Sequence, residues 1–260
     1  MGIAIPSECL LEIFEYLDRK YLFSCLLVNR QWCRYIVPIL WSRIDELSIN
    51  KNFIRTCLLL LNTEEQASLI PFNIMFPNDP KPLFEYTKYI THLRIYTYNL
   101  FNKISKFYGP FDEGGIDVFR AINCLLISKF LRTGDRIKCI EITAEQFGCC
   151  ITPSKSLYLD CFEDIHKLII HLLSENLYKD TTLASLSLNF YISSEEANIL
   201  ANALCKNTTL TSLKHRRGNF YYEEVEPLIL ALHQNTTLTC FDIARNRYGT
   251  RGGMGWKSFS

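Results

Sequence analysis

The sequence predicts a small all-α module at the N-terminus, followed by an α/β solenoid with parallel strands on its concave face and helices outside. Three observations lead to this prediction. Apolar residues between positions 7 and 37 recur at helical spacing and stop at Pro38. Residues 194–211 and 222–239 share 10 of 18 residues at a fixed offset of 28. Each copy joins a helix pattern to a short strand pattern, and repeated strand-helix units of this length are typical of solenoids.

Composition limits the function classes. A chain of 260 residues with 48% hydrophobic residues has room for a small module and a larger domain. The 28 Lys and Arg residues nearly balance the 27 Asp and Glu residues, which argues against a nucleic-acid partner. The longest aliphatic runs are too short to cross a membrane, and the N-terminus lacks the pattern of a signal peptide. We therefore expect a cytoplasmic and/or nuclear protein without a membrane partner.

No pattern of catalytic or metal-binding residues stands out. The 11 cysteines include no Cys-x-x-Cys motif, so neither a zinc site nor a redox motif is predicted. His166 and His171 are five positions apart, which places them on different faces of a helix. Phosphate-binding loops and nucleophile motifs are also missing. We expect no catalytic residue, no metal and no cofactor, and hence a protein that is not an enzyme.

The N-terminal module leaves apolar residues over. Leu10, Phe14 and Leu17 fall on one helical stripe, and Pro6 lies just before that helix, where its missing amide hydrogen costs nothing. A charged turn at 18–20 separates this helix from a second one. About forty residues cannot bury a large core, so some of the apolar side chains must face a partner or the next domain.

The order of residues in this module resembles an F-box. The residues that carry the resemblance are Ile5-Pro6, Glu8, Leu10, Ile13-Phe14, Leu17, Val28-Asn29, Trp32 and the exit pair Trp41-Ser42. The family's domain docks on the adaptor subunit of the SCF ubiquitin ligase and, through it, on a cullin. The resemblance implies an F-box at residues 1–44 with adaptor contacts at Ile5, Pro6, Leu10, Ile13, Phe14, Val28 and Trp32. The sequence departs from the family pattern at Ile5, where Leu is commoner, and at Cys9, where a larger aliphatic residue is usual.

The C-terminal half contains a repeated motif. Asn-Thr-Thr-Leu-Thr occurs at 207–211 and again at 235–239, and Asp-Thr-Thr-Leu occurs at 180–183. Each copy opens an L-x-x-L-x-L pattern of a short strand, and earlier copies of that pattern lie at 90–95 and 137–142. A unit of 28 residues with a full helix resembles the leucine-rich repeats of the ribonuclease-inhibitor-like class. The Asn or Asp of the motif should bond to local backbone at the turn from helix to strand.

These patterns predict the remaining boundaries. Helices are expected at 116–131, 163–177, 195–204 and 223–232, with insertions in 96–115 and 143–162. Residues 45–86 form a helical linker or cap, and the solenoid with irregular early repeats spans 87–248. The tail 249–260 has no helix pattern, which favours a truncated repeat over an atypical cap. His215 stands at a position that is Leu in the pattern, so we expect a local distortion there.

The concave face is the expected site of target binding. In L-x-x-L-x-L the intervening residues point outward: His92, Arg94, Lys138, Glu141, Ser185, Ser187, Ser212, Lys214 and Asp242. This mixed polar surface favours a protein target. Together the two resemblances imply a substrate-recognition subunit of an SCF-type E3 ubiquitin ligase. The alternatives are a leucine-rich-repeat regulator such as a GTPase-activating protein, and a non-catalytic scaffold. The identity of the target, any need for its modification and the oligomeric state are not predicted.

Overall fold

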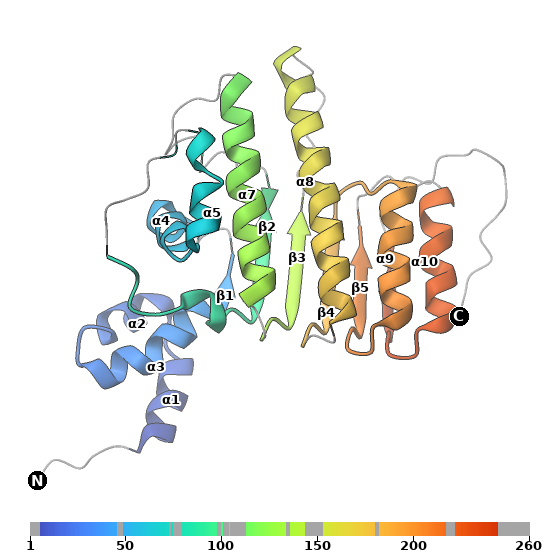
Figure 1. The fold of residues 1–260 in the computed structure, drawn as a ribbon. Helices are drawn as coiled ribbons and strands as arrows, with labels where there is room; N and C mark the ends of the chain where they lie inside the picture. The colour runs from blue at the N-terminus through green and yellow to red at the C-terminus, as the bar shows by residue number, and fades with distance from the viewer. Residues whose placement is uncertain are drawn as a thin grey trace, which may run out of the picture. The chain divides into compact units, whose positions relative to one another are not determined.

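The computed structural model describes residues 6–45, 49–72, 74, 80–97, 100, 104, 113–133, 136–143, 153–179, 182–216 and 222–243. An N-terminal helical region is followed by an α/β region with a parallel sheet of six strands, ordered as they occur in the chain (Figure 1). The chain divides into two compact units, residues 1–140 and 141–260, and each is described by itself.

The first unit contains most of the irregular structure. Its helices are α1 (Ser7–Glu15), α2 (Arg19–Cys25), α3 (Arg30–Trp41), α4 (Lys51–Leu59), α5 (Thr63–Ala67) and α7 (Glu113–Thr133). Two short 3₁₀ helices are η1 (Ile70–Phe72) and η2 (Tyr86–Tyr89). The strands are β1 (Arg43–Ile44), β2 (His92–Tyr96) and the start of β3 (Cys139–Thr143).

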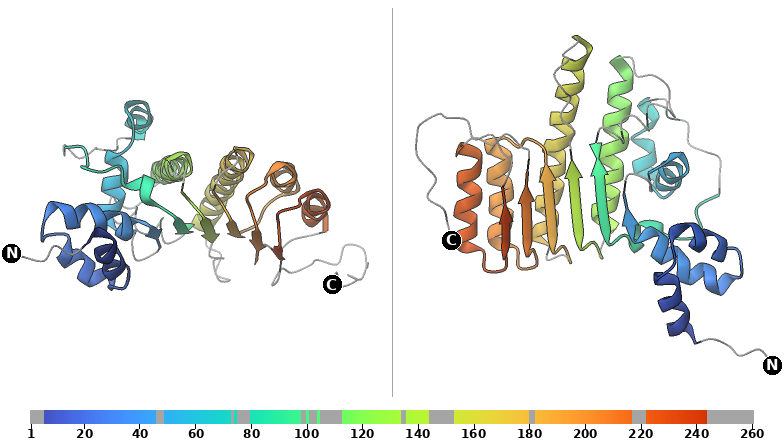
Figure 2. Two further views of the ribbon diagram at one scale, coloured as in Figure 1. Left: turned by 90° about the horizontal axis from the view of Figure 1, so that it is seen from below. Right: turned by 180° about the vertical axis from the view of Figure 1, so that it is seen from behind.

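The second unit is more regular. After the end of β3 come α8 (Pro153–Tyr178), β4 (Ser185–Asn189), α9 (Ser194–Lys206), β5 (Ser212–His215), α10 (Tyr222–Gln234) and β6 (Cys240–Asp242). The last three strands pair in parallel, β4 with β5 and β5 with β6. Within this unit α8, α9 and α10 lie on the same side of the strands (Figure 2). This is the predicted separation of strands and helices.

Helices α1 to α3 form a small core of their own. It consists of Leu10, Phe14, Leu22, Ile36 and Leu40. Asn29 caps α3 by accepting a hydrogen bond from the Trp32 amide at 2.8 Å, which satisfies one of the amides left open at a helix start. The prediction that the third apolar segment stops at Pro38 is wrong, because α3 continues to Trp41. Burial of Leu40 beyond the proline offsets the one backbone hydrogen bond that Pro38 cannot donate.

The sheet starts earlier than the repeat pattern predicts. Arg43 pairs with His92 in β2, so β1 occupies the same position in the sheet as the strand of a later repeat. The Ser42 carbonyl accepts the amides of Thr91 and His92 at 2.8 and 2.9 Å. In the second unit the carbonyl of Ala184 accepts two consecutive amides of the next strand in the same way. The predicted linker at 45–86 therefore follows the first strand of the sheet instead of preceding all of them.

The predicted helical linker is present as α4 and α5. Trp41, at the end of α3, stacks on Phe53 of α4 and on Tyr86 of η2, with ring centroids 5.2 and 4.5 Å apart. Helix α5 begins with a capping box of Asn62 and Glu65, and Arg132 of α7 forms an ion pair with the Glu65 carboxylate. Aromatic stacking thus connects the linker to α3, and the ion pair connects it to α7, all within the first unit.

Two helices start before their predicted positions. Helix α7 begins at Glu113 and includes the two glycines at 114–115, which the loop prediction assigned to an insertion. Helix α8 begins at Pro153, because proline lacks only an amide hydrogen that the first turn of a helix leaves unbonded. The other parts of the insertions 96–115 and 143–162 lie mostly outside the described residues. The tail 249–260 also lies outside them.

The repeated asparagines bond as the sequence predicts and also reach further. The Asn207 side-chain oxygen accepts the Leu210 amide at 2.7 Å, and its amide group donates to the Leu177 carbonyl at the end of α8 at 2.9 Å. Asn235 accepts the Leu238 amide at 2.7 Å and donates to the Leu204 carbonyl at 2.7 Å. Each asparagine thus closes its own turn and donates a hydrogen bond to the helix of the preceding repeat. The equivalent Asp at 180 lies outside the described residues.

Candidate protein-binding surfaces

Helices α1 and α2 and the residues directly after each of them expose an unusual number of large apolar side chains. We call these residues the apolar patch: Ile13, Tyr16, Tyr21, Phe23, Leu27 and Val28. They are six of the eleven exposed large hydrophobic residues among the described part of the chain. Tyr16 and Leu27 are almost fully accessible, at 90% and 88%. All six lie within the segment 13–28, and an excess of exposed apolar side chains in one small module is typical of protein-binding surfaces.

The patch arises because each helix buries only one narrow stripe. In α1 the stripe of Leu10 and Phe14 packs into the core, and Ile13 lies off that stripe. In α2 only Leu22 is buried, so its neighbours Tyr21 and Phe23 remain in solvent. A three-helix unit of this size has no further core in which to place them.

The predicted adaptor contacts divide into surface and core residues. Pro6, Ile13 and Val28 are exposed. Leu10 and Phe14 are buried in the core, where they support the surface instead of forming it, because the helical stripe they define is the one that faces α3. Trp32 is half-buried and makes an edge-to-face contact with the ring of Phe14 at 5.0 Å. The seventh predicted contact, Ile5, lies outside the described residues.

Four members of the apolar patch were not predicted from the sequence: Tyr16, Tyr21, Phe23 and Leu27. The sequence does carry a signal for them, since apolar residues that fall off the buried stripe of a short helix have no core to enter. The predicted contacts rest on the F-box resemblance, and the positions of that pattern include core residues such as Leu10 and Phe14.

The strand residues that the sequence predicts as target contacts are accessible, and most of them lie next to buried strand residues. In the first unit Leu93 and Ile95 of β2 are buried, and the predicted target-facing residues between and beside the buried ones are half-buried or exposed: His92, Arg94 and Lys138. In the second unit Leu186 and Leu188 of β4 are buried, and the predicted residues that remain accessible are Glu141, Ser185, Ser187, Ser212, Lys214 and Asp242. The alternation follows from the two-residue period of a strand.

The charges on these strand faces differ between the units. In the first unit burial, and after it the positive charges of Arg43 and Lys138, lower the pKa of His92, which therefore favours its neutral form. In the second unit Asp242 accepts a hydrogen bond from Nε of Arg216 at 2.8 Å, and this bond raises the pKa of the arginine. Asp242 therefore already has a cationic partner within its own unit.

Two buried histidines belong to the core of the second unit. His215 is 1% exposed, and burial lowers its pKa to about 3, against a weaker opposing effect of backbone hydrogen bonds. The expected distortion at His215 is not present, because β5 keeps its register through this residue, opposite Leu188. Burial also lowers the pKa of His166 to about 4, and its ring stacks on Phe190 at 4.2 Å.

Across the described residues no group of three or more His, Cys, Asp or Glu side chains could hold a metal ion. The same residues contain no helix that is long and apolar enough to cross a membrane.

Comparison with known families agrees with the geometry of the N-terminus. The family model described as F-box-like matches residues 3–46, which include α1, α2, α3 and β1. The chain thus carries an F-box-like domain, and F-box domains in general bind an adaptor subunit and through it a cullin. The comparison with curated proteins gives no match.

Proposed function

We propose that this chain is a substrate-recognition subunit of an SCF-type E3 ubiquitin ligase. Its F-box-like domain binds the adaptor, and its α/β region binds the target. The observation that carries the proposal is the apolar patch, because it falls within the residues of the F-box-like match. Burying such side chains against a partner removes apolar area from water, which stabilises the complex by about 25 cal/mol per Å².

The α/β region is proposed to be a leucine-rich-repeat solenoid. The support comes from β4, β5 and β6, whose paired residues Ser185, Ser212 and Cys240 are 27 and 28 positions apart. The equivalent hydrogen bonds of Asn207 and Asn235 recur with the repeat and tie each unit to the one before it. Nearest-neighbour contacts of this kind are what stabilise repeat proteins.

The target is proposed to bind the accessible faces of the strands, and the chain itself performs no chemistry. Holding a target beside a charged ubiquitin-conjugating enzyme raises the effective concentration of its lysines, which is sufficient for the role. We place this activity in the cytoplasm and/or nucleus, where thiols stay reduced. Eight cysteines among the described residues are free thiols.

The test is direct binding of the full chain to the purified adaptor by isothermal titration calorimetry. The variant Ile13→Gln/Val28→Gln changes two exposed members of the apolar patch without touching the core. The matched control is Leu83→Gln/Leu230→Gln, which makes the same chemical change at two exposed residues outside the patch. Interface anchors of this type contribute about 1–2 kcal/mol each, so the patch variant should bind at least tenfold more weakly.

The control variant should bind like the original chain. If the folded original chain does not bind the adaptor at all, the proposal is wrong and a repeat scaffold or a GTPase regulator takes its place. Stimulated GTP hydrolysis by a partner GTPase would then distinguish the second of these from the first. Equal weakening in both variants would show that the apolar patch is not the docking surface.

A further inference from the structure

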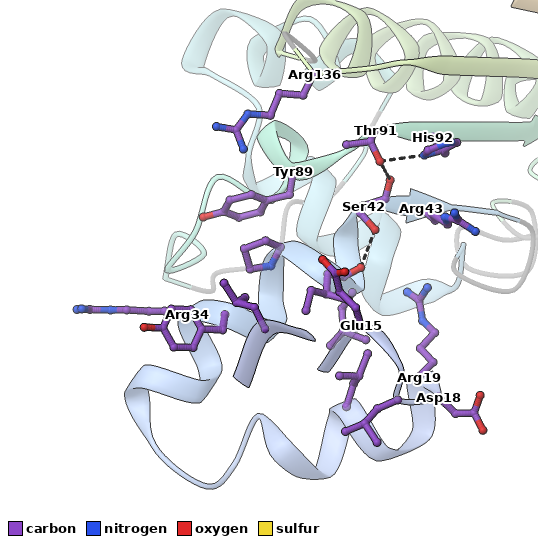
Figure 3. Close-up of a pocket in the computed structure, with 17 residues that line it drawn as sticks. Glu15, Asp18, Arg19, Arg34, Ser42, Arg43, Tyr89, Thr91, His92 and Arg136 are labelled. Carbon is purple, nitrogen blue, oxygen red and sulfur yellow. Dashed lines mark hydrogen bonds between the residues drawn. The ribbon is translucent and has the colours of Figure 1, made fainter. Parts of the chain in front are cut away.

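A large pocket opens in the first unit, beside the F-box-like helices. Its volume is about 860 Å³, and it lies between the end of α1, the start of α2, the second half of α3 and the starts of β1 and β2 (Figure 3). Its apolar lining includes Leu11, Leu17, Leu22 and Ile39. A volume of this size is in the range of pockets that hold ligands. No residue of the apolar patch lines it.

The rim of this pocket carries an excess of positive charge. Four arginines line it, Arg19, Arg34, Arg43 and Arg136, and all four are exposed. The lining carboxylates are two, Glu15 and Asp18. Among the described residues, none of the four guanidinium groups forms an ion pair, unlike Arg132 and Arg216 elsewhere in the chain.

The arginines lie on two sides of the pocket. Arg19 extends from the start of α2 toward Arg43 on β1, on one side of the pocket (Figure 3). Arg34 of α3 and Arg136, before β3, extend to the opposite side. Like charges held around an apolar surface raise the local potential and attract anions. Because arginines line the pocket on two sides, it favours a ligand with anionic groups at both ends over a single small anion.

We propose that this pocket binds an acidic segment of another protein, in which Asp or Glu residues flank an aliphatic side chain. The aliphatic side chain occupies the apolar part of the pocket, and the flanking carboxylates pair with the arginines on the two sides. Guanidinium groups suit this role because they form two parallel hydrogen bonds to one carboxylate and remain charged at every physiological pH. The pocket shares no residue with the apolar patch, so its ligand and the adaptor would contact different residues.

The experiment uses the full chain and fluorescein-labelled nine-residue peptides. The panel places a Leu, Ile or Phe at the centre with Asp or Glu at positions on both sides. A second panel replaces every Asp and Glu by Asn and Gln, and a third replaces them by phosphoserine. Binding is followed by fluorescence anisotropy at low and at physiological ionic strength, because contacts between exposed charges weaken as salt increases.

The pocket variant is Arg43→Gln/Arg136→Gln, which removes one arginine from each side. The matched control, Lys20→Gln/Arg30→Gln, removes two exposed cations of the same region that do not line the pocket. We expect at least one acidic peptide to bind, the pocket variant to weaken it at least tenfold, and the control to change it less than twofold.

Three results would overturn the proposal: no acidic peptide binds, the neutral peptides bind equally well, or the control variant weakens binding as much as the pocket variant. Tighter binding of the phosphoserine peptides than of every acidic peptide would also overturn it, in favour of a phosphopeptide site. Unchanged circular dichroism and unchanged adaptor binding of the pocket variant show that it is folded. They also separate a failure here from a failure of the proposed adaptor role.

Discussion

The hydrogen bonds of Asn207 give a sharp test of how the repeated units hold together. Replacing this residue by alanine removes the acceptor of the Leu210 amide and the donor to the Leu177 carbonyl, both of which are buried. A buried polar group left without a partner costs about 1–3 kcal/mol, so Asn207→Ala should lower the free energy of unfolding by about 2–6 kcal/mol. The Thr209 amide adds little, since it is only partly buried and water can replace the lost acceptor.

Two other asparagines serve as internal comparisons. Asn235 makes equivalent bonds in the last described unit but is half-buried, so Asn235→Ala should cost less, about 1–2 kcal/mol. Asn198 lies exposed on α9 and bonds only to a backbone carbonyl of its own helix, so Asn198→Ala should change stability by less than about 0.5 kcal/mol.

The assay is urea unfolding followed by circular dichroism, combined with hydrogen exchange at the Leu210 amide. The local measurement matters because a chain with two compact units need not unfold in a single step. Exchange at this amide should accelerate strongly in Asn207→Ala. If Asn207→Ala were no less stable than Asn198→Ala, and the Leu210 amide stayed protected from exchange, the asparagine hydrogen bonds would not be what couples neighbouring repeats.

Three further predictions concern the cores. The pKa of His215 is lowered to about 3 in the folded chain, from about 6.5 in the unfolded chain. The stability that the neutral histidine provides above pH 6.5 is therefore lost as the pH falls toward 3. Between pH 7.5 and 5 the urea midpoint of His215→Leu should shift less than that of the original chain. Trp41→Ala removes a half-buried ring that stacks on two aromatic neighbours and should cost about 2–3 kcal/mol in thermal unfolding, less than a fully buried Trp. Iodoacetamide followed by mass spectrometry should label the exposed Cys9 and Cys240 and spare Cys57, because burial raises the pKa of that thiol.

Each of these predictions has a contradicting result. An equal midpoint shift in the original chain and in His215→Leu would mean that this histidine does not contribute to acid sensitivity. A loss below about 1 kcal/mol in Trp41→Ala would mean that the stacked rings are not packed as described. Labelling of Cys57 at the rate of Cys9 would show that the core around α4 is open to solvent.

The sequence predicted best where the pattern is strict. The predicted helices at 195–204 and 223–232 agree with α9 and α10 to within two residues at each end, because the same apolar positions and the same opening pair of glutamates recur in both copies of the repeat. In β2 and β4 the apolar positions of L-x-x-L-x-L are buried and alternate with accessible residues, since only one arrangement of the strand buries them.

The sequence predicted least where a tertiary contact overrides the local pattern. Strand β1 carries no recognisable repeat pattern, because Trp41 stands where the later repeats have Leu or Ile. Only the pairing of β1 with β2 shows that β1 corresponds to the strands of the later repeats. The split of the adaptor set into exposed Ile13 and buried Phe14 depends on how α1 packs against α3, which a family pattern does not encode. The pocket draws its arginines from four separate segments, so no sequence motif marks it.

The hydrogen bonds at Ser42 bear on how a target would be presented. Because its carbonyl accepts two amides from the start of β2, the polypeptide leaves α3 directly into a strand and has no free linker at that point. In the proposed ligase role, the distance between a target on β2 and the adaptor-binding helices is then set by these hydrogen bonds. It does not vary as it would across a flexible linker. Such a connection would favour lysines at one particular distance from the docking point, so the choice of lysine on the target would be narrow.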